Sequence, residues 1–289
     1  MHYMKKHGKQ IKPILLAVVL LIIILLLIME NHGVGVTEYE LTFEDLPASF
    51  DGFRIAQISD LHNKRFGKDD SALIDPLKNA SPDLIVFTGD LIDSRRTDID
   101  KAMLLVDQAV RIAPCYYITG NHEHRLADTA TPELEKRLTD AGVTVLNDQV
   151  VPIERNGETL SLIGINDPNF WGSYSEKYCR LINEFLDPID LNPGFKILLC
   201  HRPELIDLYS GHDIDLVFTG HAHGGQFRIP YIGGVYAPRQ GFFPTYDAGV
   251  FSTDGTTMIV SRGIGNTIIP FRINNPAEIV IAELHNEKG

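Results

Sequence analysis

The stretch Asp83–Asp90 reads DLIVFTGD, and two later stretches repeat its form: Tyr117–His122 reads YITGNH and Asp215–His221 reads DLVFTGH. In each of them, an apolar run typical of a buried strand is followed by Thr-Gly and then by a side chain that can bind a metal ion. Open α/β sheets bind their ligands beyond the carboxyl ends of the strands. The three strand ends are therefore predicted to meet at one site.

Apolar runs rich in β-branched residues alternate with helical patterns through the rest of the chain. Strands are expected at Val36–Phe43, Phe53–Ser59, Leu84–Thr88, Cys115–Thr119, Leu160–Ile165, Phe195–Cys200, Ile214–Thr219, Thr257–Ser261 and Ala277–Leu284. Apolar residues at three- and four-residue spacing predict helices at Asp98–Ile112, Pro132–Ala141 and Ser175–Leu186. We expect hairpins within Val143–Ile165, with turns at Asn147-Asp148 and Asn156-Gly157. The alternation indicates an α/β fold with two packed mixed β-sheets flanked by helices.

The N-terminal segment has a different character. Ile14–Met29 reads ILLAVVLLIIILLLIM, without charge, Gly or Pro, and four lysines precede it. We predict a transmembrane signal anchor over residues 14–30, with a basic cytoplasmic N-terminus at residues 1–13. A cleaved signal peptide is the alternative, but no A-x-A-like site follows. The expected protein is a single-pass protein of the cell membrane with a short linker and first strand at residues 31–50 and one extracytoplasmic domain at residues 51–285.

Charge and cysteine content restrict the possible partners. The 26 Lys+Arg against 38 Asp+Glu give a formal net charge of -12. Residues 1–30 have a net charge of +3, with four lysines and one glutamate, so the rest of the chain has a net charge of -15. Such an acidic body makes nucleic acid an unlikely partner, because Lys and Arg carry nonspecific binding to phosphates. The three cysteines are odd in number and widely spaced, which argues against a disulfide framework.

Asp, Asn and His directly follow five of the apolar runs. Imidazole and carboxylate together suit divalent ions such as Mn, Zn or Fe, and the absence of Cys argues against a structural zinc site. Eight positions suit two ions, if one carboxylate bridges and one His stays free for chemistry. Two such ions hold the attacking and leaving oxygens of a displacement at phosphorus, and bound water becomes hydroxide near neutral pH. The eight are Asp60, His62, Asp90, Asn121, His122, His201, His221 and His223.

Glycines precede several of these side chains. Gly89, Gly120 and Gly220 stand directly before Asp90, Asn121 and His221. We expect tight turns there, because glycine tolerates positive φ and a close approach of the backbone.

In this order, the series SDLH, GD, GNHE, a lone His and GHAH resembles the calcineurin-like metallophosphoesterase superfamily, from about residue 52 to residue 284. SDLH, GNHE, HRPE and GHAHGGQFRIP also resemble its membrane-associated bacterial phosphodiesterase branch, which includes relatives of UDP-diacylglucosamine pyrophosphatase. The resemblance implies a four-layer sandwich fold. It also implies that Glu123 holds a ligand in place.

The resemblance further implies a role for each of the eight residues. Asp60, His62, Asp90 and His223 would bind the first ion. Asp90, Asn121, His201 and His221 would bind the second, with Asp90 as the bridge. His122 would be the catalytic histidine that binds no metal and acts on the phosphoryl or leaving oxygens.

The expected protein is thus a membrane-anchored phosphoesterase with two divalent metal ions, Mn, Zn or Fe. It would use a metal-activated hydroxide to hydrolyse a phosphodiester, pyrophosphate or phosphomonoester bond on a lipid or cell-envelope substrate. Two alternatives remain open. One is a non-catalytic metal-binding scaffold of the same fold, which the complete set of motif residues disfavours. The other is a nucleotide phosphodiesterase, which shares the metal chemistry but fits the acidity and the expected location less well.

Overall fold

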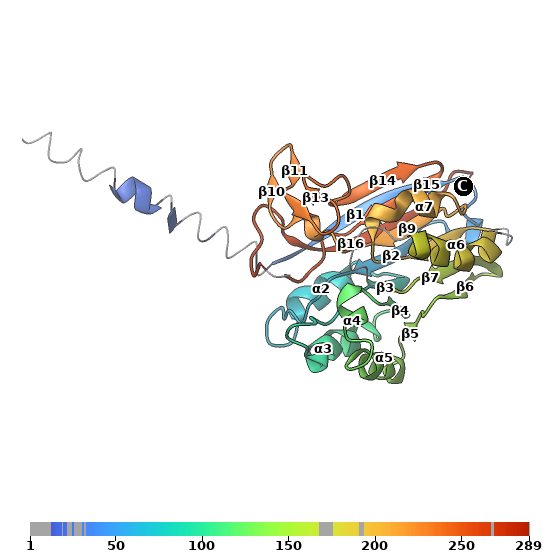
Figure 1. The fold of residues 1–289 in the computed structure, drawn as a ribbon, viewed down its shortest axis with the longest axis horizontal. Helices are drawn as coiled ribbons and strands as arrows, with labels where there is room; N and C mark the ends of the chain where they lie inside the picture. The colour runs from blue at the N-terminus through green and yellow to red at the C-terminus, as the bar shows by residue number, and fades with distance from the viewer. Residues whose placement is uncertain are drawn as a thin grey trace, which may run out of the picture.

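The computed structural model describes residues 33–167, 176–190, 194–266 and 269–288, together with residues 13–18, 20, 21, 25 and 31. Two six-stranded sheets form the centre of the fold (Figure 1). The first has the order β1 (Val34–Phe43), β16 (Ala277–Asn286), β2 (Phe53–Ile58), β3 (Leu84–Thr88), β4 (Cys115–Ile118), β5 (Thr144–Val145). The second has the order β14 (Gly249–Thr253), β15 (Thr256–Val260), β9 (Leu216–Thr219), β8 (Lys196–Leu199), β7 (Glu158–Gly164), β6 (Gln149–Arg155).

Both sheets are mixed. Strands β2 to β5 are parallel and β16 runs antiparallel to β2, whereas β15, β9, β8 and β7 are parallel between antiparallel β14 and β6. The helices are α2 (Ser71–Asn79), α3 (Ile99–Ala109), α4 (Asn121–His124), α5 (Thr131–Asp140), α6 (Glu176–Asp190) and α7 (Ile206–Ser210). Short 3-10 turns are η1 (Ala48–Phe50), η2 (Pro203–Leu205) and η3 (His223–Gly225). Two small ribbons pair β10 (Arg228–Ile229) with β11 (Gly233–Gly234) and β12 (Tyr236–Ala237) with β13 (Gly241–Phe242).

Three apolar cores separate four layers. Because side chains alternate between the faces of a strand, β3 sends Ile85 to one core and Val86 to another. The core around Ile85 joins the first sheet to α2, α3 and α5, and the core around Val86 lies between the two sheets. Leu198 and Val217 face a third core, which α6 and α7 cover. This helix–sheet–sheet–helix order confirms the predicted α/β class of two packed mixed sheets flanked by helices (Figure 1).

Part of the predicted detail is wrong. Residues 149–164 form the hairpin β6–β7 around Asn156-Gly157, but β5 and β6 belong to different sheets. The Asn147-Asp148 turn therefore carries the chain from one sheet to the other. Turn residues and apolar runs indicate where strands end, and they do not specify which strands pair. No element was expected at α2 or β14, and α6 continues four residues beyond Leu186, through Pro188.

The first strand belongs firmly to the first sheet. β1 pairs in parallel with β16 along its whole length, from Val34 opposite Ala277 to Phe43 opposite Asn286. Thr37 Oγ1 donates a hydrogen bond of 2.6 Å to the buried carboxylate of Glu278. The sheet therefore begins five residues after the apolar N-terminal run.

The predicted anchor lies mostly outside the described residues. Residues 13–18 are helical, and the side chains of Ile14 and Leu16 are exposed. Within the described part of the chain, no helix has both the length and the apolar character that crossing a bilayer requires. The anchor over residues 14–30 stays a prediction. The three cysteines are unpaired, as expected, and Cys115 and Cys200 are buried.

Candidate metal centre

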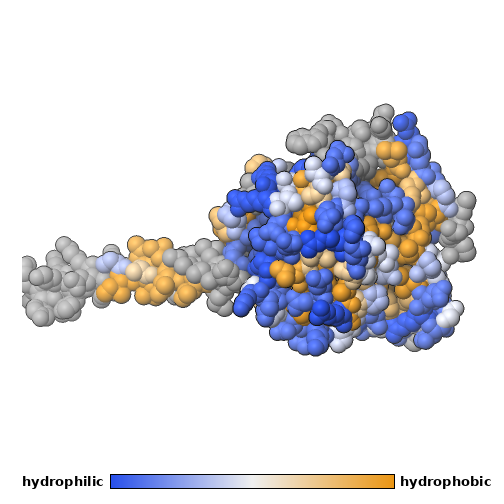
Figure 2. Space-filling model, turned by 90° about the horizontal axis from the view of Figure 1, so that it is seen from below, coloured by the Kyte–Doolittle hydropathy of each residue, from blue (hydrophilic) through white to orange (hydrophobic). Residues whose placement is uncertain are grey.

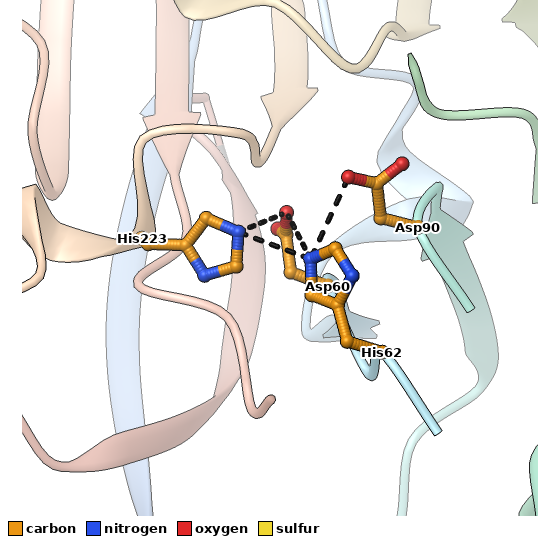
Figure 3. Close-up of side chains that lie close together, drawn as sticks. All are labelled: Asp60, His62, Asp90 and His223. Carbon is orange, nitrogen blue, oxygen red and sulfur yellow. Dashed lines mark hydrogen bonds and ion pairs between the residues drawn. The ribbon is translucent and has the colours of Figure 1, made fainter. Parts of the chain in front are cut away.

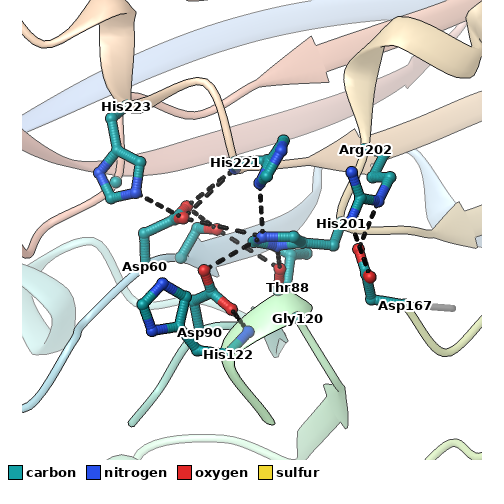
Figure 4. Close-up of polar contacts among 12 residues, drawn as sticks. Asp60, Thr88, Asp90, Gly120, His122, Asp167, His201, Arg202, His221 and His223 are labelled. Atoms are coloured by element: carbon teal, nitrogen blue, oxygen red, sulfur yellow. Dashed lines mark hydrogen bonds and ion pairs between the residues drawn. The ribbon is translucent and has the colours of Figure 1, made fainter. Parts of the chain in front are cut away.

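The strands β2, β3, β4, β8 and β9 end at one edge of the sandwich, and the eight predicted residues gather there. Figure 4 labels Asp60, Asp90, His122, His201, His221 and His223 among them. Each follows its strand closely: Asp60 and Asp90 stand two residues after β2 and β3, and His201 and His221 two residues after β8 and β9. The seven predicted ligands are between 0% and 7% exposed. Asp60, His62, Asp90 and Asn121 come from the first sheet and the other ligands from the second, so the site lies at the junction of the two sheets.

Asp60, His62, Asp90 and His223 form one group of converging side chains (Figure 3). The Nε2 atom of His223 lies 3.1 Å from Asp60 Oδ1 and 3.1 Å from His62 Nε2. His62 Nε2 lies 3.6 Å from Asp90 Oδ2. Two ring nitrogens and two carboxylates that point at one another in a buried space are the arrangement of a metal site.

A second group consists of Asp90, His201 and His221, with Asn121 beside it. His201 Nε2 lies 3.3 Å from Asp90 Oδ2 and 3.2 Å from His221 Nδ1. The amide of Asn121 lies 2.7 Å from His221 Nδ1. When the amide oxygen faces this nitrogen, two lone pairs converge, as those of two ligands do around a shared cation.

Asp90 connects the two groups through a single atom. Its Oδ2 faces His62 of the first group and His201 of the second, whereas its Oδ1 accepts a hydrogen bond of 2.8 Å from the backbone N–H of His122. One carboxylate oxygen is therefore held by the backbone and the other is left for both groups.

Further contacts orient the side chains of the site. His201 Nδ1 lies 2.8 Å from Thr88 O and donates to it, so Nε2 is the atom that faces Asp90 and His221. Ser59 Oγ donates to Asp60 Oδ2 at 2.6 Å and leaves Oδ1 toward His223. Next to His201, Arg202 binds Asp167 through two hydrogen bonds of 2.7 and 2.9 Å (Figure 4). This buried pair fixes the loop after β8.

Glu123 has the positioning contacts that the resemblance implied. Its fully buried carboxylate accepts hydrogen bonds from the backbone N–H groups of Asp90, Gly120 and Ile92 at 2.8, 2.9 and 2.9 Å. Burial and the nearby Asp90 carboxylate raise the pKa of Glu123 to about 8, although the three N–H groups lower it. Glu123 thus joins the loops after β3 and β4.

The backbone at the site is unusual. Five of the predicted ligands have positive φ, in the left-handed region that non-glycine residues rarely adopt: Asp60 (55°), His62 (48°), Asp90 (55°), His221 (65°) and His223 (50°). Such conformations cluster at functional sites, where the surrounding structure holds them.

The expected reason for the glycines is only partly right. Gly89 has a positive φ of 92°, but Gly120 has a φ of −103°, which any residue can adopt. Gly120 is needed for space, because a Cβ atom there would lie 2.2 Å from Asp90 Oδ1. At Gly220 a Cβ atom would lie 2.4 Å from Asp60 Oδ2. The ligands approach these two backbones too closely for any side chain.

Burial and charge set the protonation of the site. Burial lowers the pKa of His62 to about 3 and that of His221 well below its usual value, so both rings are neutral and can act as ligands. Burial also lowers the pKa of His201, but Asp90 and Asp60 raise it more strongly, to about 10. Burial raises the pKa of Asp60 and of Asp90, and the nearby histidines outweigh it and hold both well below the usual range.

The donor set fits two divalent ions. Four imidazoles, two carboxylates and one amide are ligands that Mn, Zn and Fe accept. The ring atoms that face the two groups are His62 Nε2 and His221 Nδ1, whereas the opposite atoms, His62 Nδ1 and His221 Nε2, are buried without a hydrogen-bond partner among the described residues. The assignment of each residue to an ion stays a prediction.

A cavity of about 390 Å³ opens over the site and is lined by Asp90, Asn121, His122, His221 and His223. Ser94 donates its backbone N–H to His122 Nδ1 at 2.9 Å, so the His122 proton resides on Nε2. Among the polar lining residues, sequence reasoning missed Asp93, Arg95 and Arg125. The spacing of Asp93 from Asp90 in GDLID, and of Arg125 from Asn121 by one helical turn, are signals that would have indicated two of them.

Residues 53–225 match the family described as calcineurin-like phosphoesterase. The chain is 30% identical over 268 residues to the "Uncharacterized metallophosphoesterase YkuE" of Bacillus subtilis, with 89% of this chain and 87% of that protein covered. It is 25% identical to the "Phosphodiesterase YaeI" of Escherichia coli, with coverage of 80% and 82%. It is 28% identical to a "Transmembrane protein with metallophosphoesterase domain" of Danio rerio, and covers 56% of that protein.

Proposed function

The chain belongs to the calcineurin-like phosphoesterase family and is a metal-dependent phosphoester hydrolase, and from this premise we propose that it is a membrane-anchored, dinuclear enzyme. Asp60, His62, Asp90 and His223 would hold one ion, and Asp90, Asn121, His201 and His221 the other. The observation that carries this proposal is that Asp90 Oδ2 lies 3.6 Å from His62 Nε2 and 3.3 Å from His201 Nε2. A single carboxylate oxygen between two groups of ligands is suited to bridge two ions.

When bound, two divalent ions supply positive charge for the phosphoryl oxygens and lower the pKa of water, so that hydroxide is available near neutral pH to attack phosphorus. The chain supplies the remainder. The hydrogen bonds of Asp90, His201 and Asp60 to backbone and hydroxyl groups hold the ligand atoms before substrate arrives, which removes reorganisation from the reaction. The cavity walls position the substrate over them.

His122 would act on the substrate directly. Its side chain is 12% exposed and lines the cavity, and burial lowers its pKa. Because Ser94 N–H occupies Nδ1, the proton on Nε2 is the one available to a phosphoryl or leaving oxygen. His122 also lies in a cluster with His62 and Asp93, but its Nδ1 already accepts the Ser94 N–H, so we assign His122 to the substrate and not to a metal ion.

Two substitutions test this assignment in the full-length chain. Asp90→Asn should lose bound metal and the hydrolysis of an aryl phosphodiester. His122→Asn should keep its metal content but lower kcat by about 10²–10⁴-fold, because general acid catalysis contributes that much. Metal analysis and kinetics of both variants measure this, with the exposed Asp107→Asn as the matched control. Full activity of Asp90→Asn, or loss of metal in His122→Asn, would contradict the proposed roles.

The membrane location forms the second part of the proposal. The apolar run Ile14–Met29 and the lysines before it support an N-terminal anchor with the catalytic domain outside the cytoplasm. The described residues of this run appear hydrophobic in Figure 2, in contrast with the largely hydrophilic face of the body. A site held close to a bilayer favours a phosphodiester or pyrophosphate bond of a lipid or envelope molecule as substrate. Protease protection and carbonate extraction of cell membranes test this location.

A further inference from the structure

A group of large apolar side chains is exposed beside the metal centre. Outside the N-terminal run, the four most exposed large apolar residues that the structure describes are Tyr231, Phe242 (74%), Ile232 (65%) and Phe243 (60%). Phe271 (45%) and Ile273 (41%) are also exposed and belong to the segment that pairs with Arg228 of β10. We call these six residues the apolar rim. Scattered exposed apolar residues need no explanation, but a concentration of this kind indicates a binding surface.

Backbone hydrogen bonds join the elements that carry the rim residues. Tyr231 and Ile232 form the loop between β10 and β11, and Phe242 belongs to β13. Phe243 N–H donates to Val235 O at 2.9 Å, which connects β13 to the end of the first ribbon. Arg228 N–H donates to Ile273 O at 3.0 Å and attaches β10 to the segment that contains Phe271. In Figure 1, β10, β11 and β13 lie together at one corner of the body.

Two rim residues carry backbone strain that burial does not explain. Tyr231 has a φ of 68° and Phe243 a φ of 54°, conformations that are outliers for bulky residues. Tyr231 is fully exposed, so no side-chain packing within the described residues stabilises this conformation. An exposed aromatic side chain that is held at such a backbone position is consistent with a function outside the molecule.

The rim borders the mouth of the catalytic cavity. The ring of Tyr236 contacts that of Phe242 at 5.5 Å between centroids, and Tyr236 also lines the cavity together with His122. Gln226, directly after η3, donates to Phe271 O at 2.7 Å. Any surface that covers the rim therefore lies next to the opening of the metal centre.

Asn31, which follows the N-terminal run, contacts the body at this same place. Asn31 Nδ2 donates to Arg272 O at 3.0 Å, and Arg272 N–H donates to Asn31 Oδ1 at 2.7 Å. Arg272 stands between Phe271 and Ile273 of the rim. In the sequence, Asn31 follows Met29, the last residue of the run, by two positions. A bilayer that holds the run would therefore lie close to the rim.

We propose that the apolar rim inserts into the interfacial layer of the bilayer and holds the mouth of the metal centre at the level of the lipid phosphates. The proposal rests on the N-terminal anchor of the proposed function. Tyr and Phe suit this layer, because their rings bury apolar area close to the polar headgroups. Seated in this way, the cavity receives phosphoesters that stay in the membrane, without extraction into water.

Tryptophan quenching in nanodiscs tests the docking directly. The chain has one tryptophan, Trp171. The fluorescence of an added tryptophan is therefore obtained by subtracting the fluorescence of the parent protein. Full-length Phe242→Trp is compared with Leu104→Trp, a matched control at a 44% exposed position on α3. In discs of phosphatidylcholine with brominated acyl chains, the added emission of Phe242→Trp should fall at least twofold relative to unbrominated discs. The emission of Leu104→Trp should change little.

The other outcomes overturn the proposal. Equal quenching of both variants would mean that the body has no fixed orientation on the membrane. Shielding of Phe242→Trp from iodide without lipid quenching would mean that a protein surface, such as a second copy of the chain, covers the rim. Hydrolysis of a soluble aryl phosphodiester is measured in the same discs. If the parent protein does not hydrolyse this substrate, the proposed enzymatic function is refuted, but the quenching result still reports on membrane docking. The two failures are therefore distinguishable.

Discussion

At the scale of single residues, the space around Gly120 is a sharp requirement of the site. Gly120→Ala would place a Cβ atom 2.2 Å from Asp90 Oδ1 and 2.5 Å from Asp90 N, so the carboxylate must move. We expect kcat/KM to fall about a hundredfold, because a displacement of about 1 Å at a reacting centre has that effect. Bound metal should fall with it. Steady-state kinetics and metal analysis measure both.

Gly35→Ala is the matched control for this substitution. Its Cβ atom would lie 3.7 Å from Ala277 O, an ordinary contact. Activity within twofold of the parent is expected. If Gly120→Ala kept full activity as well, the position of Asp90 would not matter for catalysis.

Glu123 provides a test of stability at the same scale. Above pH 8, where the Glu123 carboxylate is ionised, Glu123→Gln replaces one of two acceptor oxygens by an NH2 group, which then faces a backbone N–H of Asp90, Gly120 or Ile92. An unsatisfied buried donor costs about 1–3 kcal/mol, so we expect the free energy of unfolding to fall by that amount. Urea denaturation measures the change, and the exposed Glu133→Gln should leave it unaltered. An unchanged midpoint for Glu123→Gln would show that the three hydrogen bonds contribute nothing net.

Residue types and their order predicted the eight positions of the site, since each follows an apolar strand directly. The sequence could not specify which atoms face one another. That Asp90 uses Oδ2 toward both groups depends on the His122 N–H at its other oxygen, and this contact joins loops 32 residues apart. The positive φ of Asp60 and His221 could not be predicted from the sequence either, because Asp and His occur mostly at negative φ. Tertiary packing determines both features.

At the scale of elements, the pairing of β1 with β16 has a testable side-chain component. Thr37→Val removes the 2.6 Å hydrogen bond to Glu278, which is 2% exposed. Because the bond is to a buried carboxyl group, we expect a loss of about 1–3 kcal/mol in the free energy of unfolding. Thr42→Val, at an exposed position in the same strand, should change it far less. Thermal or urea unfolding compares the two, and equal effects would mean that β propensity alone is at work.

The accuracy of the predicted elements follows from how local each signal is. The buried parallel strands β3, β8 and β9 are short apolar runs with clear ends, and all three were predicted. Helix α2 was missed, since Pro76 interrupts its pattern and only Leu73 and Leu77 are buried on it. The wrong pairing at Asn147-Asp148 shows the general limit: partners of a strand are decided by contacts distant in the chain.

At the scale of the whole molecule, the metal centre joins the two sheets, so metal removal should weaken the entire fold. Ions at a hundredfold excess over their dissociation constant stabilise by about 2.7 kcal/mol. For a domain of this size 1 kcal/mol corresponds to roughly 2–4 °C, so EDTA should lower Tm by roughly 5–10 °C. Differential scanning fluorimetry measures this, and added Mn should restore Tm. Asp90→Asn should not respond to EDTA; an equal response would place the stabilising ion elsewhere.

The left-handed backbone at five predicted ligands has a consequence for the evolution and engineering of this protein. Each such residue costs on the order of 1 kcal/mol, and together the five approach the net stability of a typical domain. Glycine would relieve this cost at every one of them. A selection for thermal stability alone, carried out without metal, would therefore favour glycine at the ligand positions. The selected proteins would be more stable but inactive. Only selection for turnover keeps these five side chains in place.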